Sequence, residues 1–335
     1  MTVEWVVVAE DAGSALLLAP LVARLGSARC HVVALSSRSL SVFRAHNVEV
    51  GDSVVSDPRE FLKFLNPRIV VGGVSSPLPP QEPGELVFYR AAEGLGIPVV
   101  VLGDFAGCHS RLLDIVPEVF CAPDAFGVHL ATADNAAGVV EMIGYGSIRT
   151  KGPTAIAKAF VDGLRDRHGA VHVWTSGRTF QDLGLMIECM HRTKGCFVPL
   201  FHPKVADQTY GASTETYGER WHTMLRLLGD RVVWQPHGMA SDDIAMCSDS
   251  FSAGASTMLL NTAWHGIPTI SLWTPDVRAS LQAQVGLSEV PLVAIGLAHS
   301  VSAPCDLGQL SWLGKGGLDL YDPDKVVGLV GRLMR

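Results

Sequence analysis

Short, continuous runs of apolar residues alternate with segments of helical character along the first half of the chain. Runs without a polar face are typical of strands that are buried on both sides in a parallel sheet. We expect such strands at residues 5–9, 30–35, 68–73, 98–103, 118–121 and 139–143. Helices are expected between them, at residues 15–25, 37–46, 58–65 and 84–95. This alternation predicts βαβ units and a doubly wound parallel sheet.

A second series of the same kind begins near residue 172. We expect strands at 172–175, 197–201 and 231–235, and helices that end near 191 and that span 215–228 and 240–247. Ser241 would be the N-cap of the last of these helices. The stretch from Asp249 to Trp273 has the pattern of a strand, a small-residue turn, a helix and a strand. A final helix is expected at 323–335, with Asp322 as its N-cap and Pro323 as its first residue.

A chain of 335 residues is long for a single hydrophobic core, so two domains are the natural expectation. The Gly-, Ser-, Thr- and Pro-containing stretch 145–153 marks the boundary. We therefore predict an α/β protein of two Rossmann-like doubly wound parallel-sheet domains, residues 1–148 and 149–335, that face a cleft. The last helix could pack back on the N-terminal domain.

Composition excludes several classes of protein. Hydrophobic residues make up 48% of the chain and charged residues 18%, which is typical of a globular protein. The net charge of −7 gives no electrostatic footprint for nucleic acid or for an anionic membrane. No apolar run reaches the roughly 18–20 residues of a membrane-spanning helix, and no basic region precedes the first strand, so we expect neither a transmembrane segment nor a signal peptide.

The cysteines predict a reduced, cytoplasmic protein. There are seven of them, without the spacing of a disulfide framework. Cys189, His191 and Cys196 could be metal ligands, but their spacing matches no zinc pattern, and core packing is the better interpretation. We expect no metal site.

The turn within 249–273 is the first candidate for chemistry. Gly254, Ala255, Ser256 and Thr257 have little side-chain bulk, so their N–H groups could close on a ligand. A helix begins there, and helix N-termini favour anions such as phosphate. A tight turn between a strand and a helix also favours small residues, so this pattern alone leaves both interpretations open.

Two other turns should meet this one at the same sheet edge. The first contains Ser176, Gly177 and Arg178, and the second contains His202 and Lys204. N–H donors with one or two cations nearby are what a diphosphate needs. Taken singly, His202 could instead be a core histidine and Lys204 a solvated lysine.

Ligands of doubly wound sheets bind beyond the carboxyl ends of the strands, which in the N-terminal half selects the turns 10–14 and 72–76 and the loop 104–111. Glu10, Asp11 and Asp104 are acid/base candidates there, although each could simply cap a helix or a turn. The turn 10–14 lacks a G-x-G-x-x-G fingerprint, and its two carboxylates would repel a pyrophosphate. We therefore expect the phosphates on the C-terminal half.

The run from Ser252 to Pro268, S-x-G-x-S-T-M-x-x-N-x-x-x-x-G-x-P, on two Rossmann-like halves resembles the GT-B superfamily. That group contains nucleotide-sugar glycosyltransferases and UDP-N-acetylglucosamine 2-epimerases. The resemblance implies that the C-terminal domain holds the sugar nucleotide and that the N-terminal domain supplies the acceptor site and the base. The resemblance in architecture extends over nearly the whole chain. The run 252–268 is the only part whose sequence pattern is specific to the superfamily.

The resemblance also assigns roles to residues of the C-terminal half. The diphosphate would lie on residues 254–257, residues 176–178 would form the first turn of the nucleotide domain, and His202 would be the His-Pro histidine of several branches. The loop 235–239, with Gln235 and His237, would rest against the base. Asn261 stands where many members have a Glu that binds the ribose, and an amide lacks the charge-assisted strength of a carboxylate.

These assignments predict a metal-independent glycosyltransferase that moves a sugar from a nucleoside-diphosphate donor to an unknown acceptor hydroxyl. Asp104 or Asp11 would be the base, and fixed donors would stabilise the leaving diphosphate. One alternative is an epimerase or hydrolase of nucleotide sugars, in which carboxylates of the N-terminal half and His202 or His237 remove and restore protons. Another is a binding or assembly protein without turnover, which Asn261 favours. We expect no cofactor besides the substrate, and homodimer formation stays open.

Overall fold

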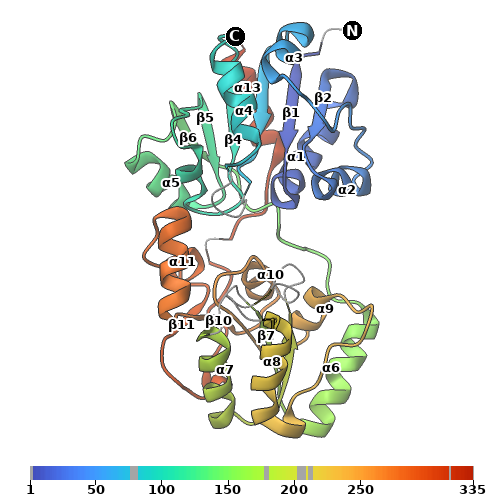
Figure 1. The fold of residues 1–335 in the computed structure, drawn as a ribbon, viewed down its shortest axis with the longest axis vertical. Coiled ribbons are helices and arrows are strands. Elements are labelled where there is room, and N and C mark those ends of the chain that lie inside the picture. The colour runs from blue at the N-terminus through green and yellow to red at the C-terminus, as the bar shows by residue number, and fades with distance from the viewer. Residues whose placement is uncertain are drawn as a thin grey trace. The chain divides into compact units, whose positions relative to one another are not determined.

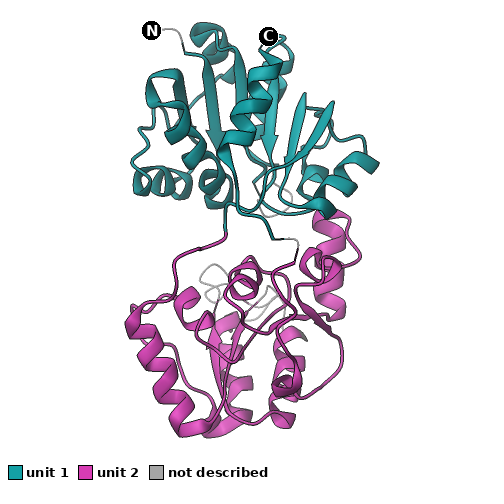
Figure 2. Ribbon diagram, turned by 180° about the vertical axis from the view of Figure 1, so that it is seen from behind, with its two compact units in different colours: residues 1–147, 317–335 teal, residues 148–316 magenta. Residues whose placement is uncertain are grey.

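The computed structural model describes residues 3–75, 82–176, 181–201, 209, 214–316 and 318–334. The chain divides into two compact units (Figure 2). Unit 1 consists of residues 1–147 and 317–335, and unit 2 consists of residues 148–316. Each unit is a parallel sheet with helices on its faces (Figure 1), so the chain has an α/β fold.

The sheet of unit 1 has six parallel strands in the order β2-β1-β3-β4-β5-β6. They are β1 (Trp5–Ala9), β2 (Cys30–Ala34), β3 (Ile69–Gly72), β4 (Val99–Leu102), β5 (Val119–Ala122) and β6 (Val139–Met142). The helices of this unit are α1 (Ala12–Leu25), α2 (Ser37–Ala45), α3 (Pro58–Leu65), α4 (Glu85–Glu93), α5 (Ala125–Ala133) and α13 (Pro323–Leu333), with 3-10 turns η1 (Ser27–Arg29) and η2 (Cys108–Leu112).

Alternate residues of β1 enter two different cores, one on each face of this sheet. Trp5 and Val7 pack on one face with residues of α1, α2 and α13. Val6 and Val8 pack on the other face with residues of α3, α4 and α5. Burial on both faces explains why the strand has no polar side in the sequence.

The sheet of unit 2 has five parallel strands in the order β11-β10-β9-β7-β8. They are β7 (Val171–Thr175), β8 (Cys196–Leu200), β9 (Ser250–Ala253), β10 (Thr269–Leu272) and β11 (His299–Val301). The helices are α6 (Ala155–His168), α7 (Gln181–Arg192), α8 (Tyr217–Leu225), α9 (Ser241–Ala245), α10 (Met258–Trp264), α11 (Pro275–Val285) and α12 (Pro291–Ala294), with 3-10 turns η3 (Arg226–Arg231) and η4 (Leu307–Gln309).

Several local predictions are confirmed. The helix predicted at 58–65 has these bounds, with Asp57 as its N-cap and Asn66 in the left-handed conformation at its end. The last helix begins as predicted, because the side chain of Asp322 accepts the N–H of Asp324 and Pro323 follows the cap.

Two local predictions are wrong. Residues 231–235 do not form a strand: η3 runs to Arg231, and only Val232 makes an isolated parallel bridge, to Phe197. Ser241 is not the N-cap of α9, because Ala240 occupies that position and the Ser241 hydroxyl donates to Gln235 instead. The helices α5 and α6 and the elements from α11 to η4 have no counterpart among the predicted ones.

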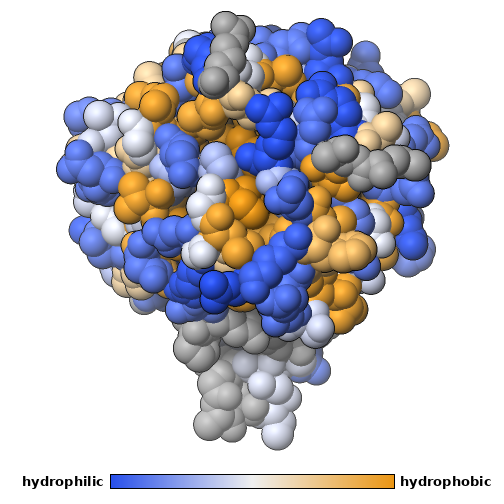
Figure 3. Space-filling model, turned by 90° about the horizontal axis from the view of Figure 1, so that it is seen from above, coloured by the Kyte–Doolittle hydropathy of each residue, from blue (hydrophilic) through white to orange (hydrophobic). Residues whose placement is uncertain are grey.

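No helix in the described ranges is long and apolar enough to cross a membrane. The face in Figure 3 mixes hydrophilic residues with patches of hydrophobic ones. Phe64 and Val54 of unit 1 are among the exposed hydrophobic residues, at 86% and 83% exposure. All seven cysteines lie in the described ranges, and none of them forms a disulfide.

Candidate functional site

The topology of each sheet identifies one candidate edge for ligand binding. In unit 1 the strand order reverses between β1 and β3, and in unit 2 it reverses between β7 and β9. Open α/β sheets bind ligands at such switch points, beyond the carboxyl ends of the strands. The turn after β1 contains Asp11, and the turn after β9 contains residues 254–257. Four of the turns chosen from the sequence, those after β1, β3, β7 and β9, therefore follow strands at the switch points.

The β1–α1 turn of unit 1 holds two carboxyl groups close together. Asp11 is the N-cap of α1, and its Oδ1 accepts the N–H of Ser14 at 2.9 Å. Asp104 follows β4, and its Oδ2 lies against the α-carbon of Gly13, where a Cβ would overlap it. A glycine is therefore required for this carboxyl group to reach the turn.

Asp104 carries a carboxyl group with an unusually high proton affinity. Its Oδ1 is inaccessible to solvent and has no hydrogen-bond partner among the described residues, although the residue as a whole is partly exposed. Burial and, to a smaller extent, the negative charge of Asp11 raise the pKa of Asp104 to about 7, although Arg111 opposes them. A carboxyl group with this pKa can take up or release a proton near neutral pH.

Glu85, at the first turn of α4, is a third carboxyl group at this site and was not among the residues predicted from the sequence. It is fully buried, and burial raises its pKa to about 7. Its Oε1 accepts the N–H of Glu10 at 2.9 Å and the hydroxyl of Ser75 at 2.5 Å. A Glu at the start of a helix is common because it suits the helix dipole, so the sequence contains no signal for this role.

Glu10 supports the turn rather than exposing its carboxylate to a ligand. Its Oε2 accepts the N–H of Gly84 at 2.6 Å, just before α4 begins. Its carbonyl oxygen accepts the hydroxyl of Ser36, the N-cap of α2. The acid/base candidates of unit 1 thus fall into two groups, with Asp104 and Asp11 at the turn and Glu10 in its support.

In unit 2 the predicted phosphate turn leads from β9 into α10. Gly254 is buried, and its carbonyl oxygen accepts the hydroxyl of Ser271 at 2.9 Å. Ala255 and Thr257 are exposed, and Ser256 lies between them with its hydroxyl accepting the N–H of Met258 at 3.2 Å. The turn is therefore exposed at Ala255 and Thr257, while its first residue is fixed in the core.

Asn261 of α10 is only 7% exposed, and its side chain binds the chain itself. Its Oδ1 accepts the N–H of Arg149 at 2.8 Å, and His265 Nε2 lies 2.7 Å from the Arg149 carbonyl oxygen, to which it donates. The Arg149 guanidinium reaches the buried carboxylate of Asp243 at 2.5 Å. These three side chains hold Arg149, close to the start of unit 2, against α9 and α10.

Other predicted residues of unit 2 have local partners. The Gln235 amide donates to the carbonyl oxygen of Met239 at 2.5 Å and so closes the loop around the exposed His237. Ser176 follows β7, is 3% exposed, and donates its N–H to Leu200 at 3.0 Å. The remaining predicted residues lie outside the described ranges: Gly177, Arg178, His202 and Lys204.

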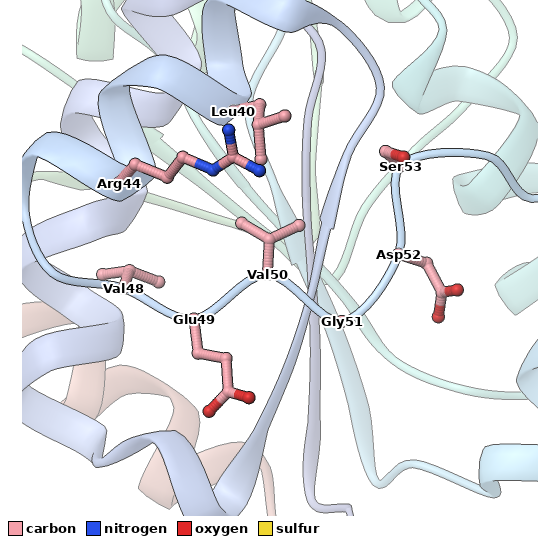
Figure 4. A pocket seen from close by; sticks show the side chains of 8 residues that line it. All are labelled: Leu40, Arg44, Val48, Glu49, Val50, Gly51, Asp52 and Ser53. Atoms are coloured by element: carbon pink, nitrogen blue, oxygen red, sulfur yellow. The ribbon is translucent and has the colours of Figure 1, made fainter.

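A pocket of about 330 Å³ lies elsewhere in unit 1, between α2 and the segment 48–53 (Figure 4). The Arg44 side chain extends beside Val50, whereas the carboxylates of Glu49 and Asp52 point away from Arg44. Asp52 is engaged with His31 at 2.8 Å. The pocket adjoins the edge strand β2 and contains none of the candidate residues. Within the described ranges, no three His, Cys, Asp or Glu residues cluster as metal ligands would.

Two parallel-sheet units, each a doubly wound α/β fold, define the GT-B type of fold that the sequence resemblance implied. No protein-family model and no curated protein matches the chain by sequence. Solved structures match it over nearly its whole length.

These similar structures are nucleotide-sugar enzymes. The S. aureus MnaA–UDP structure has a TM-score of 0.65 at 12% identity and covers 99% of this chain and 96% of its own. UDP-GlcNAc 2-epimerase from Neisseria meningitidis, bound to UDP-GlcNAc, has a TM-score of 0.60 at 10% identity and covers 98% and 100%. The Methanocaldococcus jannaschii UDP-GlcNAc 2-epimerase, with UDP-GlcNAc and UDP, has a TM-score of 0.59 at 10% identity and covers 99% and 93%. At these identities the likeness concerns the fold.

Proposed function

We propose that the chain is an enzyme that acts on a UDP-sugar and inverts the configuration at the sugar carbon next to the anomeric carbon. The observation that carries this proposal is the Asp104 carboxyl group, which lies beside Asp11 at the switch-point edge of unit 1 with its pKa raised to about 7. The fold of UDP-GlcNAc 2-epimerases supports epimerisation over transfer to an acceptor, the reaction that the sequence first favoured.

The chemistry needs an acid and a base but no oxidant or reductant. The sugar C2–H bond and the anomeric C–O bond to the diphosphate break, a C1=C2 double bond forms, and the proton moves to a carboxylate. Return of the diphosphate to C1 and of a proton to the opposite face of C2 gives the epimer. Asp104 suits the proton-transfer role because groups with a pKa near the operating pH are efficient acid/base catalysts. Asp11 is our candidate for the second carboxyl group.

The turn at 254–257 in unit 2 is our candidate for binding the diphosphate. Negative charge grows on the diphosphate oxygen as the anomeric bond breaks, and fixed N–H donors stabilise such charge without reorganising. The small residues Gly254, Ala255 and Ser256 support this role because they let a ligand approach the main chain. No metal or cofactor is required by this scheme.

The decisive experiment is an incubation of the full chain with UDP-GlcNAc in D₂O without an acceptor, followed by NMR. Epimerisation through C2–H cleavage should place deuterium at C2 and produce a second UDP-sugar. A hydrolase would release UDP and keep the C2 proton, and a strict transferase would leave the donor intact. Asp104→Asn should abolish the exchange, whereas Asp166→Asn, at an exposed position of α6, should not.

Two negative results would have different meanings. UDP-sugars that raise the melting temperature but never acquire deuterium would overturn epimerisation and leave the nucleotide-sugar site in place. Failure of every nucleoside diphosphate and nucleotide sugar to raise the melting temperature would overturn the site as well.

A further inference from the structure

Glu85 joins three segments that are distant in the sequence. Its Oε1 accepts two hydrogen bonds, one from the main-chain N–H of Glu10 at 2.9 Å and one from the Ser75 hydroxyl at 2.5 Å. Ser75 Oγ in turn accepts the main-chain N–H of Asp11 at 3.0 Å. The consecutive N–H groups of Glu10 and Asp11 are therefore both held by Glu85, one directly and one through Ser75.

This network has little freedom to rearrange. Glu85 is 0% exposed and Ser75 is 1% exposed. The second carboxylate oxygen of Glu85, Oε2, is buried without a hydrogen-bond partner in the described part of the chain. Burial of a carboxyl group with one unsatisfied oxygen is costly. Directly and through Ser75, Glu85 supports the turn against which the Asp104 carboxyl group lies.

We propose that Glu85 is a positioning residue for the carboxyl site: it fixes the β1–α1 turn, directly and through Ser75, so that Gly13 receives the Asp104 carboxyl group and Asp11 lies beside it. Its catalytic consequence rests on the proposed function. Glu85 does not touch the sugar in this scheme. It acts through the main chain of residues 10 and 11 and through its charge.

The charge of Glu85 gives the role a signature that a purely structural residue would lack. An ionised Glu85 raises the pKa of Asp104, in the same direction as burial and Asp11. The groups that act on Asp104 or sense its charge are Asp11, Glu85, Arg111, Cys108 and Tyr145. The titratable groups that interact with Glu85 are Asp11 and Tyr89. The Glu10 carboxylate accepts the N–H of Gly84, next to the start of α4.

The test compares amide hydrogen exchange at Glu10 and Asp11 in the full chain and its variants. Glu85→Ala should speed exchange at both amides by about tenfold, the effect of losing one buried hydrogen bond. Ser75→Ala should speed exchange at Asp11 by a similar factor and spare Glu10, because only Asp11 loses its partner. Glu85→Gln retains an acceptor oxygen and should resemble the wild type. Glu93→Gln, at the exposed end of the same helix, is the control and should change neither amide.

A second readout follows the Asp104 carboxyl carbon by NMR as the pH changes. In Glu85→Gln the negative charge is absent, so Asp104 should titrate at lower pH than in the wild type, and Glu93→Gln should leave its titration unchanged. Neither readout needs turnover, so failure of the proposed function would leave both intact. Unchanged exchange at Glu10 and Asp11 in Glu85→Ala and Ser75→Ala, or an Asp104 titration that Glu85→Gln does not lower, would overturn the positioning role. If Glu85→Ala does not fold, Ser75→Ala and Glu85→Gln still decide.

Discussion

The Asp104 carboxyl group occupies the space that a side chain at Gly13 would fill. Gly13→Ala should therefore push Asp104 away from Asp11 while leaving the sheet intact, since Gly13 lies in the first turn of α1. Misplacing a catalytic group by about 1 Å can cost on the order of 100-fold in rate. We expect a loss of this size in kcat for the UDP-sugar reaction, measured by NMR.

The control for Gly13→Ala is a glycine with open space around it. Gly163 lies within α6, and a Cβ there would meet nothing within 4 Å. Gly163→Ala should leave kcat unchanged and stabilise the chain by roughly 0.5–1 kcal/mol, because alanine favours helices over glycine. Equal activity of Gly13→Ala and Gly163→Ala would contradict the catalytic placement of Asp104.

Activity should depend on pH through Asp104. The base must be ionised, and burial raises the pKa of Asp104 from its usual 3.8 to about 7. We expect kcat/KM to fall about tenfold per pH unit below about 7 and to level off above it. An acidic limb near pH 4 would show that another group is the base. The measurement is a pH profile of initial rates, with circular dichroism at each pH to exclude unfolding.

Stability should change with pH in the opposite direction. Burial raises the pKa of Glu85 from its usual 4.5 in the unfolded chain to about 7 in the folded one, so the folded state binds the proton more tightly. Its contribution is fully present below pH 4.5 and is lost as the pH rises through about 7, in total about 3 kcal/mol. Urea unfolding of Glu85→Gln from pH 4 to pH 8 should show a correspondingly weaker pH dependence than the wild type. Equal slopes would contradict the burial of an ionisable Glu85.

Asn261 should contribute to stability. Asn261 is only 7% exposed and its Oδ1 accepts the N–H of Arg149 at 2.8 Å, so Asn261→Ala leaves that N–H unpaired. The expected loss in the free energy of unfolding is about 1–2 kcal/mol. Asn261→Asp keeps the acceptor and should lose less. The dissociation constant for UDP, measured by calorimetry, should change by less than about threefold in Asn261→Asp. A clear gain in affinity would favour a ribose contact at this position instead, because a carboxylate accepts charge-assisted hydrogen bonds from ribose hydroxyls.

Local signals in the sequence located most elements of unit 1. The helix at 58–65 was predicted to the residue, and the structure shows what sets its bounds: Asp57 is its N-cap, Pro58 is its first residue and Asn66 is its left-handed end. The strands were found because burial on both faces leaves continuous apolar runs. The strand expected at 231–235 is absent because 3-10 turns on both sides of a kink at Gly229, whose φ is 57°, run as far as Arg231, and only Val232 then pairs with β8.

The candidate site was predictable where it depends on strand ends and hidden where it depends on tertiary contacts. Asp11 and Asp104 follow buried strands, so the rule for doubly wound sheets selects them directly. Glu85 lies 75 residues after Glu10, whose N–H donates to the Glu85 carboxylate. Nothing in the local sequence around Glu85 indicates that its side chain is buried. The bond between Asn261 and Arg149 spans 112 residues and is equally invisible to a local pattern.

The diphosphate role of the turn at 254–257 can be tested at its buried end. A Cβ at Gly254 would approach Val277 Cγ2 to 2.7 Å, and a buried, β-branched valine has few rotamers into which it can retreat. Gly254→Ala should therefore push the turn outward and shift the N–H groups of Ala255 and Ser256. We expect the affinity for UDP to fall about tenfold or more by calorimetry, because anion binding by main-chain donors depends on their geometry. Gly184→Ala in α7, where a Cβ would meet nothing within 4 Å, is the matched control and should bind UDP as the wild type does. Unchanged UDP binding by Gly254→Ala would mean that the diphosphate lies elsewhere.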